Sequence, residues 1–336
     1  MTQQRPGGPG GPGGPGGPMV RMTRNFGSFG SGRSVVGQTI LELGQKYDNV
    51  WAMAADTGGS LAAFRQAFPD RFIDVGIAEQ NLAGIAAGLA LEGNIPFISG
   101  MIPFMVMRAC EQNRTEIAYQ DLPVRLIGTG GGLTSGGGST HNAMEDIAIM
   151  KSMVNMTVLS IGDPNMIKDI LILSMTYPHP MFIRLAQGKQ DRLLYEPGSI
   201  TFEIGKGLPV RAGKDATIIA HGEMVFQSIE AAKDLETEGI SVGVIDMYSI
   251  KPVDKDLIIK TVRETGNILV IEDHLMEGGL ASTVADVFAD SGVYPKKFKR
   301  LGIPQVYAGF GSAQEQRKKY GYDKAATVAA VKGMLK

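Results

Sequence analysis

The stretch of residues 71–93, RFIDVGIAEQNLAGIAAGLALEG, constrains the fold more than any other part of the chain. Its apolar lead-in, FIDV, is too short for a helix and predicts a buried strand, whereas the apolar residues from Leu82 to Leu89 recur at helical spacing. A strand therefore turns directly into a helix, with Glu79 on the turn. A carboxyl group at this place is either an ordinary first-turn acid, favoured by the helix dipole, or a functional acid.

The same alternation of strand and helix recurs along the chain and predicts an α/β fold with parallel sheets. We expect two consecutive three-layer α/β/α domains, at residues 34–190 and 215–336. The expected strands are at 50–55, 72–75, 96–99, 124–128, 158–160, 181–185, 217–220, 242–246 and 268–272. The expected helices include 34–46 with Ser34 as its cap, 60–68, 103–119, 145–152, 225–238, 254–264, 280–291 and one that begins at Pro164.

Two segments lack this pattern. Residues 6–18 repeat Pro-Gly-Gly, and a basic run rich in Gly and Ser follows them to residue 33. Because the repeat is too short to hold a triple helix, we expect residues 1–33 to form a disordered extension. Residues 191–214, rich in charge and Gly, are expected to be a linker with one short hairpin.

Composition excludes several classes of function. With 43% apolar and 20% charged residues and a net charge of -1, the chain has no excess charge to attract nucleic acid or a membrane surface. Its single cysteine, Cys110, cannot form an internal disulfide, which fits the cytoplasm. The four histidines fall in no metal-ligand spacing, so we expect no metal site in this chain.

Three polar residues follow predicted strands at the same expected edge of the first sheet: Asp56, Glu79 and His141. Taken singly, each has an ordinary explanation as a capping or surface residue. Ligands of open α/β sheets bind at the carboxyl ends of the strands, however, so their convergence there indicates a functional site. Residues 128–139, with seven glycines in twelve positions, follow a strand at the same edge.

The sequence around these residues resembles that of a known protein family. Residues 72–93 resemble the pyrimidine-binding domain of transketolase-type thiamine diphosphate enzymes, whose signature is Gly-Ile-Ala-Glu-Gln. Further similar runs are RACEQ at 108–112, GSTH at 138–141, FIR at 182–184, VIDM at 244–247, IKP at 250–252 and IEDH at 271–274. The last three resemble the transketolase C-terminal domain. The resemblance covers residues 34–334 in the family's order and implies a pyrimidine-type domain followed by a transketolase C-terminal-like domain.

The resemblance implies roles for single residues near the cofactor. Glu79 would hydrogen-bond a ring nitrogen of the aminopyrimidine of thiamine diphosphate, and Asp56 and Ile77 would lie beside the cofactor. An aromatic ring that precedes the RACEQ helix would stack on the aminopyrimidine. Phe104 is the residue we expect there, and the alternatives are Phe97, Met101 and Met105.

Fewer of the family's substrate contacts than of its cofactor contacts have a counterpart in this sequence. His141 matches a histidine that hydrogen-bonds substrate oxygens in many relatives, and Arg184 is a candidate for contact with a substrate anion. Three other polar contacts of the family have no counterpart, since their positions fall at 129–131, 136–138 and Gln187. This predicts a substrate other than the usual pentose phosphates, or a phosphate that is held mainly by a partner chain.

The Gly-Asp-Gly motif that binds the diphosphate and its metal is not present in the sequence. The chain therefore resembles the second half of a transketolase, as in two-gene enzymes, and we expect it to be inactive alone. The expected partner is an N-terminal transketolase-like subunit that carries Gly-Asp-Gly and holds magnesium or calcium, in a heterotetramer of two plus two.

The implied reaction is transfer of a two-carbon ketol unit from a ketose, or its phosphate, to an aldose. Two alternatives remain open within thiamine chemistry, namely the beta subunit of a 2-oxoacid dehydrogenase and an enzyme similar to deoxyxylulose-phosphate synthase. A third alternative, of another class, is a non-catalytic regulatory subunit that keeps the fold. Retention of Glu79 favours an enzyme.

Overall fold

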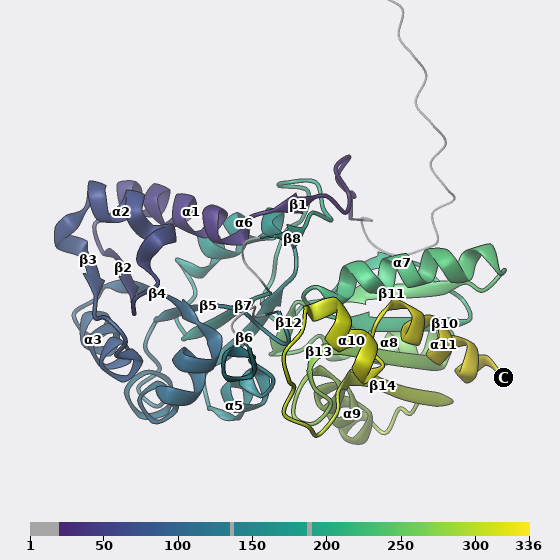
Figure 1. The fold of residues 1–336 in the computed structure, drawn as a ribbon. Coiled ribbons are helices and arrows are strands. Elements are labelled where there is room, and N and C mark those ends of the chain that lie inside the picture. The colour runs from purple at the N-terminus through teal and green to yellow at the C-terminus, as the bar shows by residue number, and fades with distance from the viewer. Residues whose placement is uncertain (1–19, 135–137, 187–189) are drawn as a thin grey trace, which may run out of the picture.

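The computed structural model describes residues 20–134, 138–186 and 190–336 of the chain. Its first domain is built on a seven-stranded sheet with the order β12-β6-β7-β5-β4-β2-β3 (Figure 1). The strands are β2 (Val50–Ala54), β3 (Phe72–Asp74), β4 (Ile95–Met101), β5 (Arg125–Thr129), β6 (Thr157–Ile161), β7 (Met181–Leu185) and β12 (Ser249–Lys251). All neighbours in this sheet are parallel except β12, which runs antiparallel to β6.

Helices cover both faces of this sheet, which gives the expected three layers. On one face lie α1 (Gly32–Lys46), α2 (Ala62–Ala67) and α6 (Pro164–Ser174). On the other lie α3 (Glu79–Leu91), α5 (Asp146–Ser152) and a helical segment at 104–118 (Figure 1). Every residue of β5, β6 and β7 is buried, which explains why these strands are nearly continuous apolar runs.

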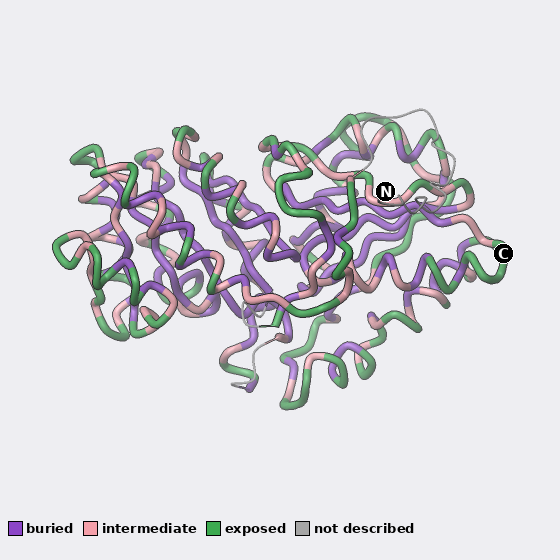
Figure 2. Tube along the Cα trace, turned by 90° about the horizontal axis from the view of Figure 1, so that it is seen from above, coloured by how far each residue is buried: buried purple, intermediate pink, exposed green. Residues whose placement is uncertain are grey.

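The second domain repeats this plan around a five-stranded sheet with the order β14-β13-β10-β11-β9. Its strands are β9 (Leu208–Arg211), β10 (Ala216–Ala220), β11 (Val242–Asp246), β13 (Asn267–Leu275) and β14 (Lys297–Ile303). Helices α7 (Met224–Thr237) and α11 (Lys324–Leu335) cover one face, and α8 (Lys255–Thr265) and α9 (Leu280–Ser291) cover the other. Figure 2 shows buried strands running through both domains between partly exposed helices. The predicted α/β class is confirmed.

Several elements differ from the prediction. The segment expected to be a linker supplies β8 (Asp191–Arg192) and β9, and β9 joins the second sheet antiparallel to β11. Strands β12 and β14 and the helices α10 (Ala313–Tyr320) and α11 were not predicted. Strand β14 is polar and exposed at residues 297–300 because it is the edge of its sheet, so it carries no apolar run.

Part of the expected disordered extension is ordered. Phe29–Gly30 forms β1 and pairs with β8, and Met22 bridges to Tyr195. The ring of Phe26 packs against Phe226 of α7, with the centroids 5.6 Å apart. These contacts give residues 20–33 a place between the two domains, whereas the prediction for residues 1–19 lies outside the described residues.

Two helices begin or run differently from the expectation. The N-cap of α1 is Ser31, whose hydroxyl accepts a hydrogen bond from Ser34 N, so the helix begins before the predicted cap. The segment expected as one helix at 103–119 contains two π-helical turns, Phe104–Arg108 (η3) and Asn113–Ala118 (η4), on either side of a short α-helical turn. Such turns are frequent at functional sites.

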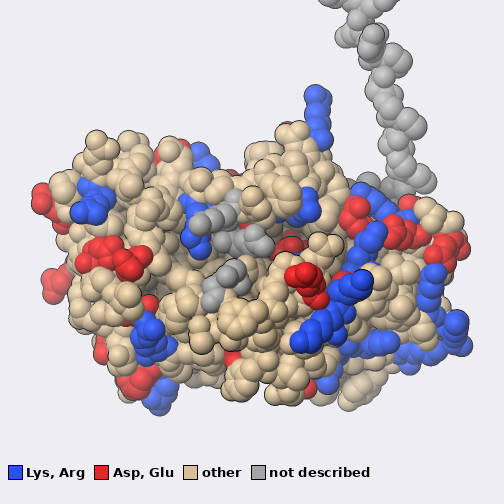
Figure 3. Space-filling view, viewed as in Figure 1, with Lys and Arg blue, Asp and Glu red and all other residues tan. Residues whose placement is uncertain are grey.

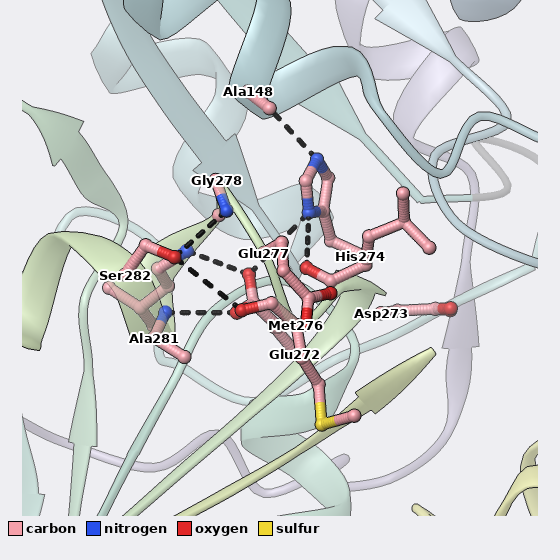
Figure 4. A network of polar contacts seen from close by, with 12 residues as sticks. Ala148, Glu272, Asp273, His274, Met276, Glu277, Gly278, Ala281 and Ser282 are labelled. Carbon is pink, nitrogen blue, oxygen red and sulfur yellow. Dashed lines mark hydrogen bonds and ion pairs between the residues drawn. The ribbon is translucent and has the colours of Figure 1, made fainter. Parts of the chain in front are cut away.

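Buried polar networks join the two domains. The carboxylate of Glu272 accepts hydrogen bonds from the backbone N–H groups of Leu280 and Ala281 at the start of α9 (Figure 4). Beside it, His274 Nε2 accepts a hydrogen bond from the N–H of Ala148 in α5 of the first domain, at 3.3 Å. Because β12 also belongs to the first sheet, the domains share backbone as well as side-chain contacts. Among the described residues, no helix is long and apolar enough to cross a membrane.

A second junction contains two buried acids. Tyr195 donates its hydroxyl hydrogen bond to Asp246 Oδ2 at 2.8 Å, and its N–H donates to Asp163 Oδ2 at 2.6 Å. Burial raises the pKa of Asp246 to about 7, although the Tyr195 hydroxyl lowers it, and burial raises the pKa of Asp163 to about 6. Between about pH 4 and pH 6, both acids therefore hold protons in the folded chain that an ordinary aspartate would release.

We expect Asp246→Asn to stabilise the chain at alkaline pH. The folded-state pKa of Asp246 lies above its unfolded value of about 3.9, so the free energy of unfolding falls as pH rises from about 4 to above 7. An amide cannot ionise and still accepts the Tyr195 hydrogen bond. Unfolding by urea should show a gain of about 1–3 kcal/mol at pH 8 that shrinks towards pH 5. The exposed control Asp48→Asn should show no such pH-dependent gain, and an equal effect of both variants would contradict the assignment.

Candidate functional site

The candidate site lies at the carboxyl edge of the first sheet. Strands β2, β3, β4 and β5 are parallel, so the segments that follow them meet at one edge. Glu79 is the first residue of α3, and its neighbour Ala78 provides no side-chain cap. Its carboxylate therefore lies at a helix N-terminus, where the helix dipole stabilises negative charge.

Glu79 is almost completely buried, with 6% of its surface exposed. Its Oε2 atom accepts a hydrogen bond from Arg108 Nη1 at 2.5 Å, and Arg108 itself is 40% exposed. No other hydrogen bond to the Glu79 carboxylate is found among the residues that the structure describes. One carboxylate oxygen is thus fixed by a cation, and Oε1 has no hydrogen-bond partner among the described residues.

The rings of Phe104 and His141 extend the group of contacts formed by Glu79 and Arg108. The Arg108 guanidinium lies over the Phe104 ring, 4.5 Å from its centroid, and the His141 ring meets Phe104 edge-on at 5.1 Å between centroids. Phe104 and Arg108 are the two ends of the π-helical turn η3, which brings both side chains to the same place. The structure thus brings Glu79, Phe104 and His141 together, and adds Arg108.

Two of the three alternatives for the stacking residue are buried, whereas the third, Met101, is half-buried like Phe104. The buried apolar residues form two clusters. Phe97 is fully buried in one of them, and Met105, 2% exposed, lies in the other. Neither side chain can offer a face to a ligand without rearrangement of the core. Phe104 remains the residue that we propose for stacking.

Ile77 and Asp56 lie at the same edge but outside this contact chain. Ile77 is 71% exposed on the segment between β3 and α3. Asp56 is exposed after β2 and has a left-handed backbone with φ of 53°, held by a 3.0 Å hydrogen bond from its N–H to Asp74 Oδ1. Within the described ranges, the Asp56 side chain makes no hydrogen bond or ion pair with Glu79, Phe104 or His141.

Arg184, the candidate for a substrate anion, is instead a structural residue. It is 2% exposed, and its Nε donates to Asp146 Oδ2 at 2.6 Å while Nη2 donates to the Asp273 carbonyl at 2.8 Å. The charge of Arg184 is balanced by Asp146, and its guanidinium group joins the first domain to the second. We therefore withdraw Arg184 from the candidate site.

Another cation at this edge was missed from the sequence. Arg33, in the first turn of α1, donates from Nη2 to Thr129 Oγ1 at the end of β5, at 2.8 Å. Its Nε is buried and has no hydrogen-bond partner within the described part of the chain. Ser31 is a sequence signal that could have identified Arg33. If Ser31 is taken as the helix cap in place of Ser34, the predicted helix includes Arg33 in its first turn.

The glycine-rich segment is shaped by the second domain. Gly132 has φ of +71°, and a Cβ atom built there would lie 2.2 Å from Cγ of Asp273. Gly138 has φ of +85°, and a Cβ atom there would lie 2.3 Å from the ring of Phe310. Both positions therefore require glycine, because a side chain would collide with the second domain.

Comparisons with known proteins agree with this architecture. The family model for the transketolase pyrimidine-binding domain matches residues 31–190, and the one for the transketolase C-terminal domain matches residues 205–326. A putative transketolase C-terminal section from Methanocaldococcus jannaschii is 39% identical over 294 residues, which is 87% of this chain and 92% of that protein.

The chain belongs to the transketolase family. It is also 35% identical to one of the subunits of apulose-4-phosphate transketolase from Phocaeicola vulgatus, over 85% of this chain and 91% of that protein. A solved structure described as a split-gene transketolase, an inactive β4 tetramer, superimposes with a TM-score of 0.83. It is 37% identical, and the match covers 91% of this chain and 98% of that one.

Membership of this transketolase family implies dependence on thiamine diphosphate, and the site fits the pyrimidine half of that cofactor. Glu79 offers a buried carboxylate with one oxygen unpartnered, and Phe104 offers a ring beside it. The described residues contain no group of three or more His, Cys, Asp or Glu side chains that could hold a metal ion.

Proposed function

We propose that this chain is the C-terminal subunit of a split transketolase. Joined to a second subunit, it transfers a two-carbon ketol unit from a ketose, or its phosphate, to an aldose. The observation that carries this proposal is the buried carboxylate of Glu79, with one oxygen fixed by Arg108 and the other without a partner.

In this proposal each residue of the site has a role. When bound, thiamine diphosphate supplies a nucleophilic carbon that no protein side chain offers. Glu79 Oε1 would hydrogen-bond a ring nitrogen of the aminopyrimidine, and Arg108 would keep the carboxylate in place. Phe104 would stack on the ring, Ile77 and Asp56 would line its surroundings, and His141 would hydrogen-bond a substrate oxygen.

The proposed assembly pairs this chain with a subunit that carries Gly-Asp-Gly and holds the diphosphate with magnesium or calcium. We propose a heterotetramer of two plus two. The proposal is supported by similar proteins that are named as a section or a subunit of a transketolase. The similar solved structure, a β4 tetramer, is described as inactive, which supports the proposal that the chain alone has no activity.

The experiment that tests the function is reconstitution. The chain would be co-expressed with the Gly-Asp-Gly subunit of the same genome, and ketol transfer would be assayed with phosphorylated and unphosphorylated ketoses. We expect activity only in the mixture and only with thiamine diphosphate and magnesium. A complex that binds thiamine diphosphate but transfers no ketol unit from any ketose would contradict the transketolase assignment.

We propose that the donor or acceptor carries an anionic group, which Arg33 binds. The guanidinium of Arg33 contacts Thr129 at the end of β5, where the charge of Asp191 also acts on it, and the name of a similar protein refers to a sugar phosphate. Arg33→Gln should raise KM for a phosphorylated substrate about ten- to hundredfold, because hydrogen bonds to charged groups contribute about 1.5–3 kcal/mol. The exposed control Arg24→Gln should leave KM unchanged, and equal KM values for Arg33→Gln and the parent enzyme would remove Arg33 from the site.

A further inference from the structure

The loop that follows β14 exposes three apolar side chains. Tyr307 is 89% exposed, Phe310 is 86% exposed and Val306 is 43% exposed. We call these three residues the aromatic rim. Ala308, between them in the sequence, is buried, so the loop is anchored to the second domain while its larger side chains point outwards.

Hydrogen bonds hold the loop at both ends. Gln305 donates from its amide to Glu277 Oε2 at 2.9 Å, before the rim. After it, Ser312 and Glu315 form a capping box at the start of α10, and Gln316 donates to the Gly311 carbonyl at 3.2 Å. These hydrogen bonds hold the two ends of the loop, and between them the rings of Tyr307 and Phe310 are exposed.

The rim reaches the candidate site. The Phe310 ring lies against Gly138, where a Cβ atom would be 2.3 Å from it, and Gly138 begins the turn Ser139–His141. His141 in turn contacts Phe104. Ile77, two residues before Glu79, is 71% exposed. Apolar side chains are therefore exposed both on the segment before Glu79 and on the loop beside Gly138.

Such exposure is costly unless another surface covers it. Burial of one aromatic side chain from water contributes about 1.5–3 kcal/mol, and aromatic residues dominate the energetics of interfaces. Figure 3 shows largely uncharged surface to the left of the basic side chains that gather over α10. A small substrate bound at His141 could touch Phe310, but could not cover side chains that extend along the loop to Val306.

We propose that the subunit that holds the diphosphate covers the aromatic rim when the two chains assemble. This inference rests on the proposed function, in which one cofactor contacts both subunits. A chain that reaches a diphosphate beside Glu79 must approach the edge of the sheet where His141, Gly138 and Phe310 lie. The rim is then the part of the interface contributed by the second domain.

The test compares serine variants in the complete chain. Tyr307→Ser and Phe310→Ser replace exposed side chains, so the fold should tolerate them. Tyr294→Ser is the matched control, because Tyr294 is 67% exposed but precedes β14, at the opposite end of that strand. The dissociation constant for the Gly-Asp-Gly subunit is measured by analytical ultracentrifugation, and the assembly state of this chain alone is measured in parallel.

We expect each rim variant to raise the dissociation constant about ten- to hundredfold, as aromatic residues at interface centres do, and the control to leave it unchanged. An unchanged dissociation constant for the Gly-Asp-Gly subunit, together with a raised KM for the sugar substrate, would overturn the proposal. It would assign the rim to substrate binding. Loss of self-association with an unchanged constant would assign it to a second copy of this chain and also overturn it. If the parent chain does not bind the Gly-Asp-Gly subunit, the proposed function fails first.

Discussion

Glu79→Gln is expected to lower the rate of ketol transfer by the assembled enzyme by about a hundred- to ten-thousandfold, the usual contribution of a positioned acid or base. Glutamine has the same shape but cannot share a proton with a ring nitrogen in the same way. Because Glu79 pairs with Arg108, the substitution also leaves one cation without its partner, but Arg108 is 40% exposed and water can solvate it.

The matched control is Glu92→Gln, at the opposite end of the same helix, where the side chain is exposed. It should have the parent rate. Binding of thiamine diphosphate is measured by the quenching of intrinsic fluorescence. This measurement distinguishes loss of proton sharing by residue 79 from loss of cofactor binding. A Glu79→Gln enzyme with the parent rate would remove Glu79 from the mechanism, and with it the observation on which the proposed function rests.

Arg317→Met is expected to destabilise the chain by about 3–5 kcal/mol, the usual cost of removing one partner of a buried ion pair. Arg317 is 3% exposed and donates to Asp273 Oδ2 at 2.5 Å and to Glu223 Oε1 at 2.7 Å. Burial alone would raise the pKa of Asp273, but the Arg317 charge and hydrogen bond outweigh it and hold that pKa below its ordinary value. Without Arg317, Asp273 becomes a buried charge with less compensation.

The loss should be largest at neutral pH and smaller in acid, where Asp273 takes up a proton in the variant. Urea unfolding at pH 7 and pH 5 measures both values. Lys318→Met, the exposed neighbour in α10, is the control and should change stability by less than about 0.5 kcal/mol. The double variant Arg317→Met with Asp273→Asn should recover part of the loss, since it removes the buried charge. Equal losses in the single and double variants would contradict this account.

Most strands of both sheets could be predicted from the sequence because they are buried on both faces. Such strands are unbroken apolar runs bounded by polar residues, as at β5 and β7. Strand β3 was predicted too, but it is a partly exposed edge strand and not the buried strand expected. The same reasoning failed for β9, β12 and β14, which lie at sheet edges and carry Pro, Lys or Ser. At an edge, pairing is decided by tertiary contacts that no local pattern records.

The site could be predicted only in part for a similar reason. Glu79 and His141 follow predicted parallel strands, so their place at one edge was foreseeable, whereas Asp56, predicted with them, lies outside the contact group and Phe104 was expected only from the family resemblance. The pairing of Arg108 with Glu79 depends on the π-helical turn between Phe104 and Arg108, which changes which side chains share a face. Arg184 lies in the predicted strand 181–185, so its burial was foreseeable, whereas its partners Asp146 and the Asp273 carbonyl were not, because no local pattern records these long-range contacts.

Strand β12 has a consequence for any attempt to recombine this chain with its relatives. It lies beyond the first domain in sequence, yet Ser249 and Lys251 pair with Leu159 and Val158 of β6 and close that side of the first sheet. A fragment cut near residue 200 would leave the backbone of β6 open to pairing with other molecules. Chimeras should therefore exchange whole chains, or take residues 249–251 from the same parent as β6, so that the first sheet keeps its own last strand.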